Sequence, residues 1–198
     1  AVDLILPLAA YAFVMSITPG PNNLMLAASG IAFGMRRTLP HMLGISVGFS
    51  ALLVACGLGL GALMTGVPAT ALALKLLGTG YLLYLSWRMR RAFSVESNQS
   101  LARPMSFVEA SLFQFVNPKG WLAALTGVAV FLPGQEIRWA GIALFVAVFL
   151  VVGFPCIATW AALGTAVRRL IARRGWSSAL SAVVMLLMGY TIIAIWLQ

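Results

Sequence analysis

Apolar residues run along this chain in long stretches with almost no charge, separated by short polar segments. A helix that crosses a membrane needs about 20 apolar residues. Stretches near that length or longer lie at residues 2–35, 39–64, 69–87, 105–132, 137–163 and 176–197. We therefore predict an all-α integral membrane protein with six transmembrane helices, forming a single transmembrane domain over residues 1–198.

Two of these stretches contain residues that break helices. The first is interrupted by Thr18-Pro19-Gly20-Pro21-Asn22-Asn23 and the fourth by Gln114-Phe115-Val116-Asn117-Pro118-Lys119-Gly120. A helix reaching Thr18 should end there, because proline lacks an N–H and pushes the residue before it out of helical geometry. Gly20 can turn in almost any direction, and Pro21 suits the first position of a new helix. We predict that helices one and four are broken near the middle of the membrane.

Short matches relate the two halves of the chain. Thr18-Pro19 is matched by Asn117-Pro118, Val47-Gly48-Phe49 by Val152-Gly153-Phe154, and Gly80-Tyr81 by Gly189-Tyr190, in the same order. They indicate two three-helix repeats at about 1–93 and 104–198, joined by a cytoplasmic linker at about 94–103. Because three is odd, the second repeat runs opposite to the first. Broken helices at corresponding positions of inverted repeats point to a transport site.

The net charge of +9 comes mostly from arginines in alternate connections between the apolar stretches. These connections follow residues 35, 87 and 163. Such alternation is typical of the positive-inside rule rather than of nucleic-acid binding. We therefore predict a multi-pass protein of a cytoplasmic membrane with both termini in the periplasm, and anionic membrane lipid as a partner of the arginines.

Lys119 is a cation at the predicted middle of the membrane, where it costs about 2.5 to 3.5 kcal/mol on insertion scales. Asp3, Glu96 and Glu136 lie at an end or in loops, and Glu109 is about 15 Å away along a helix. We expect a substrate carboxylate to be the missing partner. The alternative is that backbone carbonyls freed by Pro118 hold the ammonium.

The predicted breaks carry groups that complement both charges of an amino acid. A helix beginning at Pro21 presents free N–H groups to a carboxylate. Carbonyls at residues 17–20, and side-chain oxygens of Asn22, Asn23 and Asn117, suit an ammonium. Because no acid is predicted at this depth, neutral amino acids are favoured over basic ones. The predicted substrate-binding residues are Thr18, Pro19, Gly20, Pro21, Asn22, Asn23, Gln114, Asn117, Pro118 and Lys119.

Coupling to protons requires a group that titrates, and Lys119 and Glu109 are the leading candidates. A divalent metal as cargo would call for a cluster of acidic, His or Cys ligands. His41 is the single histidine, expected at the cytoplasmic interface, and Cys56 and Cys156 are isolated. With no C-x-x-C or H-E-x-x-H motif we expect no metal, no cofactor and no enzyme activity. A non-transporting membrane assembly subunit and a homo-oligomer stay open.

The motif at residues 18–23, Gly44 and Gly48, and the motif Gln114-Phe115-x-Asn117-Pro118-Lys119 together resemble the LysE/RhtB family of amino-acid exporters. The resemblance covers essentially the whole chain. It implies efflux of amino acids or close derivatives across the bacterial inner membrane, driven by the proton-motive force through proton antiport. It also implies that the proline, glycine, asparagine and lysine residues of the two motifs are signature positions, and it leaves the substrate undecided.

Overall fold

All regular structure in the described part of the chain is helical. The computed structural model describes residues 2–60, 68–93, 103–132, 138–172 and 177–197. The helices of the first half are α1 (Val2–Ile17), α2 (Pro21–Phe33), α3 (Met35–Ala55) and α5 (Pro68–Phe93). Those of the second half are α6 (Phe107–Phe113), α7 (Pro118–Phe131), α8 (Arg138–Val148), α9 (Phe154–Ala172) and α10 (Ser177–Leu197). The predicted cytoplasmic linker, except for its last residue Arg103, and the residues Glu96 and Glu136 lie outside the described residues.

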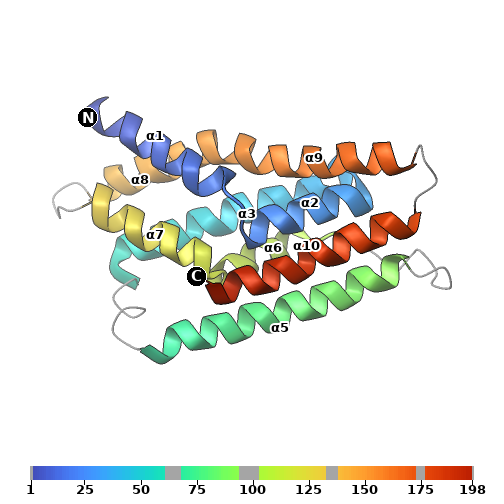
Figure 1. Ribbon diagram of the computed structural model, residues 1–198. Helices are drawn as coiled ribbons and strands as arrows, with labels where there is room; N and C mark the ends of the chain where they lie inside the picture. The colour runs from blue at the N-terminus through green and yellow to red at the C-terminus, as the bar shows by residue number, and fades with distance from the viewer. Residues whose placement is uncertain (1, 61–67, 94–102, 133–137, 173–176, 198) are drawn as a thin grey trace.

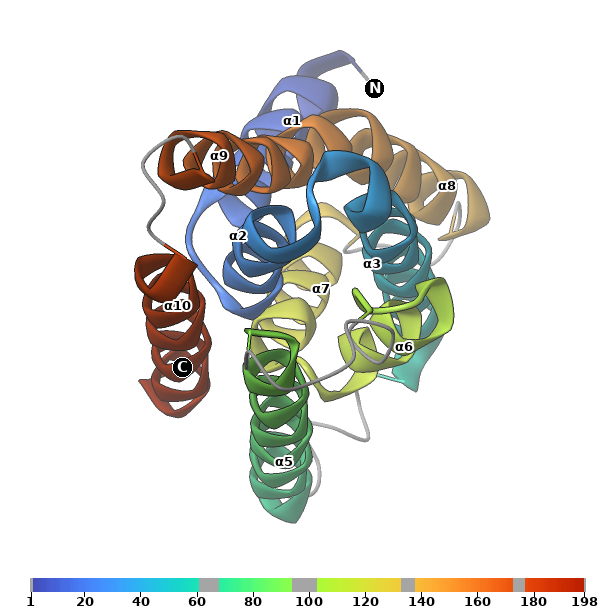
Figure 2. The same cartoon turned by 90° about the vertical axis from the view of Figure 1, so that its right-hand side faces the viewer.

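The helices form one bundle with α2 and α7 at its centre (Figures 1 and 2). In the end-on view of Figure 2, α1, α3, α5, α6, α9 and α10 surround this central pair. Helix α2 packs against α9 and α10, while α3 packs against α6 and α5 against α10. Elements from the two halves of the sequence are therefore interleaved.

The helices are long and apolar in the manner of a membrane protein. Met35–Gly59 and Trp139–Leu170 each have the length and hydropathy to cross a membrane, and Leu4–Ile17 with Pro21–Phe33 does so as a pair bent by 54°. Large apolar side chains are exposed on the outside, including Val151 at 75% and Leu186 at 73%. Such an exterior suits lipid rather than water. The chain is an integral membrane protein.

Two glycines bring α2 and α9 into backbone contact. A Cβ added at Gly30 would collide with the carbonyl oxygen of Ala161, and one at Gly164 with the carbonyl oxygen of Ala27. Small residues allow this close approach, which in lipid is the main source of helix association.

Close packing at glycines also joins α3 to α6. Cβ atoms at Gly44 and Gly48 would meet the backbones of Phe107 and Ser111, and the Ser111 hydroxyl donates to the Gly44 carbonyl at 3.0 Å. The two glycines therefore serve contacts within one chain.

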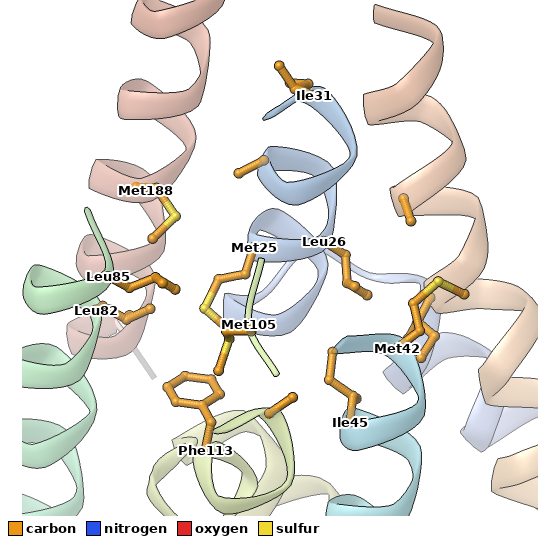
Figure 3. Close-up of a cluster of buried hydrophobic side chains, with 14 of the residues drawn as sticks. Met25, Leu26, Ile31, Met42, Ile45, Leu82, Leu85, Met105, Phe113 and Met188 are labelled. Atoms are coloured by element: carbon orange, nitrogen blue, oxygen red, sulfur yellow. The ribbon is translucent and has the colours of Figure 1, made fainter. Parts of the chain in front are cut away.

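Buried apolar side chains of α2 meet those of five other helices, α3, α5, α6, α9 and α10 (Figure 3). Met25 and Leu26 of α2 lie close to side chains of α3, α5, α6 and α10. Three of the labelled partners are Met42, Phe113 and Met188. Flexible methionines fill irregular gaps between helices that cross at different angles.

Several boundaries differ from the sequence-based prediction. Helix α3 begins at Met35, α5 continues to Phe93 and α9 to Ala172, so most of the described arginines lie on helix ends rather than in loops. Arginine is a good helix former, and its long stem lets a helix continue past the apolar layer with its charge in water. His41 is 1% exposed and is therefore buried in the bundle, while its depth in a membrane stays a prediction.

Two helices contain π-helical turns. One covers Cys56–Leu60, where Gly59 has a φ of 104°, and the other covers Phe149–Gly153. The second lies directly before Phe154 and Pro155. Pro155 has no N–H to bond the carbonyl of Val151, and the local widening of the helix accommodates that loss.

Candidate functional site

The first interruption is an elbow between α1 and α2, defined here as Thr18–Gly20. Helix α1 ends at Ile17 and α2 begins at Pro21, where the two prolines predicted an end and a start. Gly20 is extended, with φ −178° and ψ 177°, a geometry that any residue adopts. The backbone conformation at this position therefore does not require glycine. A Cβ at Gly20 would lie 2.6 Å from Cδ of Lys119, so the glycine makes room for the lysine.

Side chains satisfy the carbonyls that this elbow frees. The Asn23 amide donates to the carbonyls of Ser16 and Thr18, both at 2.8 Å. The indole N–H of Trp160 in α9 donates to the carbonyl of Ile17 at 3.0 Å. Backbone groups in an apolar environment need such partners, and Asn23 and Trp160 supply them without water.

Lys119 connects the two halves of the chain at this elbow. Its ammonium donates to the carbonyl and the hydroxyl of Thr18, both at 2.8 Å, and to the carbonyl of Pro19 at 3.1 Å. An ammonium has three hydrogens, so all its donors are used. The acceptors are neutral oxygens, and no carboxylate is among them. The lysine is thus held by carbonyls, as the alternative supposed, but by those of the first elbow rather than those freed at Pro118.

The second elbow lies between α6 and α7 and consists of a 3₁₀ turn at Gln114–Val116 followed by Asn117. Asn117 is extended, with φ −90° and ψ 106°, and α7 begins at Pro118. The Trp121 indole N–H donates to the carbonyl of Phe115 at 2.9 Å. This elbow is therefore also closed by a side chain of the helix that follows it.

A reciprocal amide pair joins the two elbow regions. Asn22 Nδ2 donates to Gln114 Oε1 at 2.7 Å, and Gln114 Nε2 donates to Asn22 Oδ1 at 3.1 Å. Gln114 Nε2 also donates to the carbonyl of Ala110 at 3.0 Å. Gln114 is fully buried, so these contacts fix the start of α2 against the end of α6.

A cavity of about 80 Å³ lies against both elbows. A single water needs about 10 to 15 Å³ measured in this way, so the cavity has room for several waters or one small solute. Its lining includes the predicted residues Gly20, Asn22, Asn23, Asn117 and Lys119. The other predicted residues lie behind this wall: Thr18 and Pro19 hold Lys119, Gln114 holds Asn22, and Pro21 and Pro118 begin the two helices.

Asn117 lines the cavity and carries an unsatisfied acceptor. The residue is 2% exposed, and its buried Oδ1 has no hydrogen-bond partner. A buried amide oxygen without a partner costs about 1 to 3 kcal/mol. A bound group that donates a hydrogen bond would remove this cost.

The remaining walls of the cavity include residues outside both sequence motifs. Helix α3 contributes Ser46, Phe49 and Ser50, and the π turn before α9 contributes Phe149. The rings of Phe49 and Phe149 lie 5.1 Å apart. The available signal was the four-residue spacing of two serines in an apolar helix, which places both hydroxyls on one face.

Glu109 lies away from the cavity, at the start of α6. It forms a capping box with Ser106, whose hydroxyl accepts from Glu109 N at 3.2 Å while the carboxylate accepts from Ser106 N at 2.7 Å. The carboxylate also accepts two hydrogen bonds of 2.8 Å from the Arg103 guanidinium. Glu109 is thus engaged in local contacts, and it is not among the cavity-lining residues.

Among the described residues, no group of three or more His, Cys, Asp or Glu side chains is arranged to hold a metal ion. Cys56 and Cys156 are buried free thiols, one in the π turn after α3 and one in α9.

Comparison with known proteins identifies the relatives of this chain. The family model described as LysE type translocator matches residues 13–194. A cysteine/O-acetylserine efflux protein of Escherichia coli strain K12 is 30% identical over 188 residues, which are 93% of each chain. One from Salmonella typhimurium strain LT2 is 29% identical over the same share. No solved structure matches the chain. With the family model covering nearly its whole length, the chain belongs to the LysE-type translocator family.

Proposed function

We propose that this protein is a secondary active exporter that moves small neutral amino acids, or close derivatives of them, out of the cytoplasm. The observation that carries the proposal is the cavity between the elbows, whose lining includes Lys119 and no acidic residue. A zwitterion with a neutral side chain brings one carboxylate for this ammonium. A basic amino acid would bring a second cation that nothing in the lining neutralises. The names of the relatives, cysteine and O-acetylserine efflux, agree with this substrate class.

In the proposed complex the substrate carboxylate lies between Lys119 and the start of α2. The first N–H groups of a helix have no partner inside it and carry partial positive charge, so Asn22 and Asn23 at this end of α2 favour an anion. The substrate ammonium donates to Asn117 Oδ1, the buried acceptor that has no partner. Both charged groups of the amino acid are then held at the elbows.

The substrate must exchange places with a contact that already exists. All three hydrogens of the Lys119 ammonium are bound to Thr18 and Pro19, so the carboxylate has to replace at least one of these acceptors. The carbonyl of Thr18 keeps a donor when Lys119 leaves it, because Asn23 also bonds to it. This second donor lowers the cost of the exchange.

The transport cycle we propose is alternating access between two inverted repeats of three spans each, with the broken helices near mid-membrane. The order of elements supports it. Each half contains an interrupted helix, then a helix with a π turn, then an uninterrupted helix, which is α5 in the first half and α10 in the second. Rocking of one half against the other would expose the cavity first to one side and then to the other.

We propose that export is coupled to proton entry and that Lys119 carries the exchanged proton. Of the two candidates, Lys119 is in the cavity where substrate binds, whereas Glu109 is bound to Arg103 and Ser106. The chain would lie in the bacterial inner membrane with both termini in the periplasm, as its arginine distribution favours. A C-terminal alkaline phosphatase fusion should be active, and an inactive one would contradict this orientation.

The test is transport by the purified protein in liposomes. Vesicles loaded with labelled cysteine, O-acetylserine or serine should lose label faster than protein-free vesicles, and an imposed proton gradient should accelerate the loss. Labelled lysine is the control cargo, and it should leave vesicles that contain the protein no faster than it leaves protein-free vesicles. Failure to move any neutral amino acid would reject transport in favour of an assembly role.

A further inference from the structure

Ser46 and Ser50 lie one turn apart on α3, and both line the cavity. The Ser46 hydroxyl donates to the carbonyl of Met42 at 3.1 Å, and the Ser50 hydroxyl donates to the carbonyl of Ser46 at 2.8 Å. A serine hydroxyl has a single hydrogen. With that hydrogen committed to the backbone, each oxygen can only accept a hydrogen bond from a ligand.

The surroundings of these two acceptors are apolar. Ile45 and Phe49 flank them on α3, and Phe149 closes against Phe49 with ring centroids 5.1 Å apart. Each serine is partly exposed, and its oxygen keeps lone pairs that can accept from a ligand donor in addition to the bond its hydrogen makes to the backbone. This wall therefore combines apolar side chains with two oxygens that can accept a hydrogen bond from a ligand.

The direction of a bound amino acid follows from its covalent structure. Its carboxylate and ammonium share one carbon, so when both are held by Lys119, the start of α2 and Asn117, the side chain must extend away from the elbows. Outside the elbows, the α3 wall offers two hydroxyls and the ring of Phe49 on one helix.

We propose that Ser46 and Ser50 form the side-chain subsite of the cavity and select amino acids whose short side chain ends in a hydrogen-bond donor. A hydroxyl or thiol would be preferred over a methyl group of similar size. The proposal rests on the proposed function, and it adds two specificity-determining residues that lie outside both sequence motifs.

The test compares serine, cysteine and 2-aminobutyrate, whose side chains have similar size but end in O–H, S–H and CH₃. Initial efflux rates are measured in liposomes for the unmodified protein, Ser46→Ala, Ser50→Ala and the double variant. One hydrogen bond changes binding by about three- to tenfold. We expect the preference for serine over 2-aminobutyrate to fall by about that factor in the double variant, with 2-aminobutyrate itself little affected. The single variants give the same reading should the double variant fold poorly.

Thr165→Val is the matched control. Thr165 also donates to the carbonyl four residues earlier, at 2.8 Å, but it lies in α9 outside the cavity, so its loss should leave the preference unchanged. Equal loss of all three substrates in the serine variants would overturn the subsite, since the serines would then contact the part that amino acids share. An unchanged preference would also overturn it, while transport itself would stand. Absence of transport of every substrate by the unmodified protein would instead reject the proposed function.

Discussion

The ammonium of Lys119 lies 2.8 Å from both oxygens of Thr18, its carbonyl and its hydroxyl. This contact joins the first residue of one elbow to the start of the helix that follows the other. The proposed substrate carboxylate would compete for the same ammonium. We therefore expect substitution of Lys119 to weaken substrate binding in a protein that still folds.

Lys119→Met should reduce efflux of neutral amino acids by about 10- to 100-fold, because a hydrogen bond to a charged group contributes about 1.5 to 3 kcal/mol. The measurement is the initial rate in liposomes per amount of folded protein. Lys75→Met is the control, since Lys75 is a lysine of α5 outside the cavity. Transport at the unmodified rate in Lys119→Met would remove the lysine from the mechanism.

Gly20→Ala should also reduce efflux, although the lysine itself is not substituted. The new Cβ would lie 2.6 Å from Cδ and 3.0 Å from Nζ of Lys119, so the flexible lysine must leave Thr18 and Pro19. Gly80→Ala in α5 adds a methyl group where nothing lies within 4 Å, and it should transport normally. If Gly20→Ala bound and exported substrate as well as the control, the position of Lys119 would not matter.

Local rules were enough to place the elbows along the chain. Proline acts on its own residue and its immediate neighbours, so Pro19, Pro21 and Pro118 can be interpreted without knowledge of the fold. The depth of the elbows in a membrane and the inverted repeat stay predictions. The same rules assigned the wrong reason to Gly20, whose extended backbone suits any residue and whose missing Cβ makes room for a side chain from the other half.

Contacts between the elbows could not be derived from sequence, because they depend on how the two halves pack. The carbonyls near Thr18 were expected to receive an ammonium from the substrate, and in the structure they receive that of Lys119. Ser46 and Ser50 were missed for another reason. A serine that bonds its own helix is common in apolar helices, and only the position of α3 beside the cavity distinguishes these two.

The amide pair of Asn22 and Gln114 should couple the elbows energetically. Asn22→Ala leaves the buried amide of Gln114 without this partner, at a cost of about 1 to 3 kcal/mol, and Gln114→Ala does the same to the partly buried amide of Asn22. The double variant should cost less than the sum by about 0.5 to 3 kcal/mol, as expected for residues in contact. Unfolding in mixed micelles measures this cycle. Gln114→Ala combined with Thr191→Val, whose hydroxyl bonds the carbonyl of Leu187, should be additive.

Gly164→Ala should destabilise the bundle by about 1 to 3 kcal/mol, the usual cost of overpacking. The added methyl group would collide with the backbone of Ala27, which cannot move aside as a side chain can. Gly189→Ala is the control, because a Cβ at Gly189 meets nothing within 4 Å. Equal unfolding midpoints for the two variants would show that α2 and α9 tolerate separation.

Glu109→Gln should leave the dependence of efflux on the proton gradient intact. Glutamine preserves the capping box with Ser106 but cannot form the ion pair with Arg103, so this change isolates the negative charge. Efflux rates with and without an imposed gradient provide the measurement. Loss of gradient dependence with normal substrate binding would transfer the proton-carrying role from Lys119 to Glu109.

The indole of Trp160 helps the first elbow to keep its shape whether or not a substrate is bound. Because Trp160 and Asn23 bond the carbonyls of Ser16, Ile17 and Thr18, the bend keeps its shape in the absence of any amino acid. A transporter with such a preformed bend need not refold its backbone at every turnover. Evolution can then retune the walls of the cavity for new cargo while leaving the bend alone.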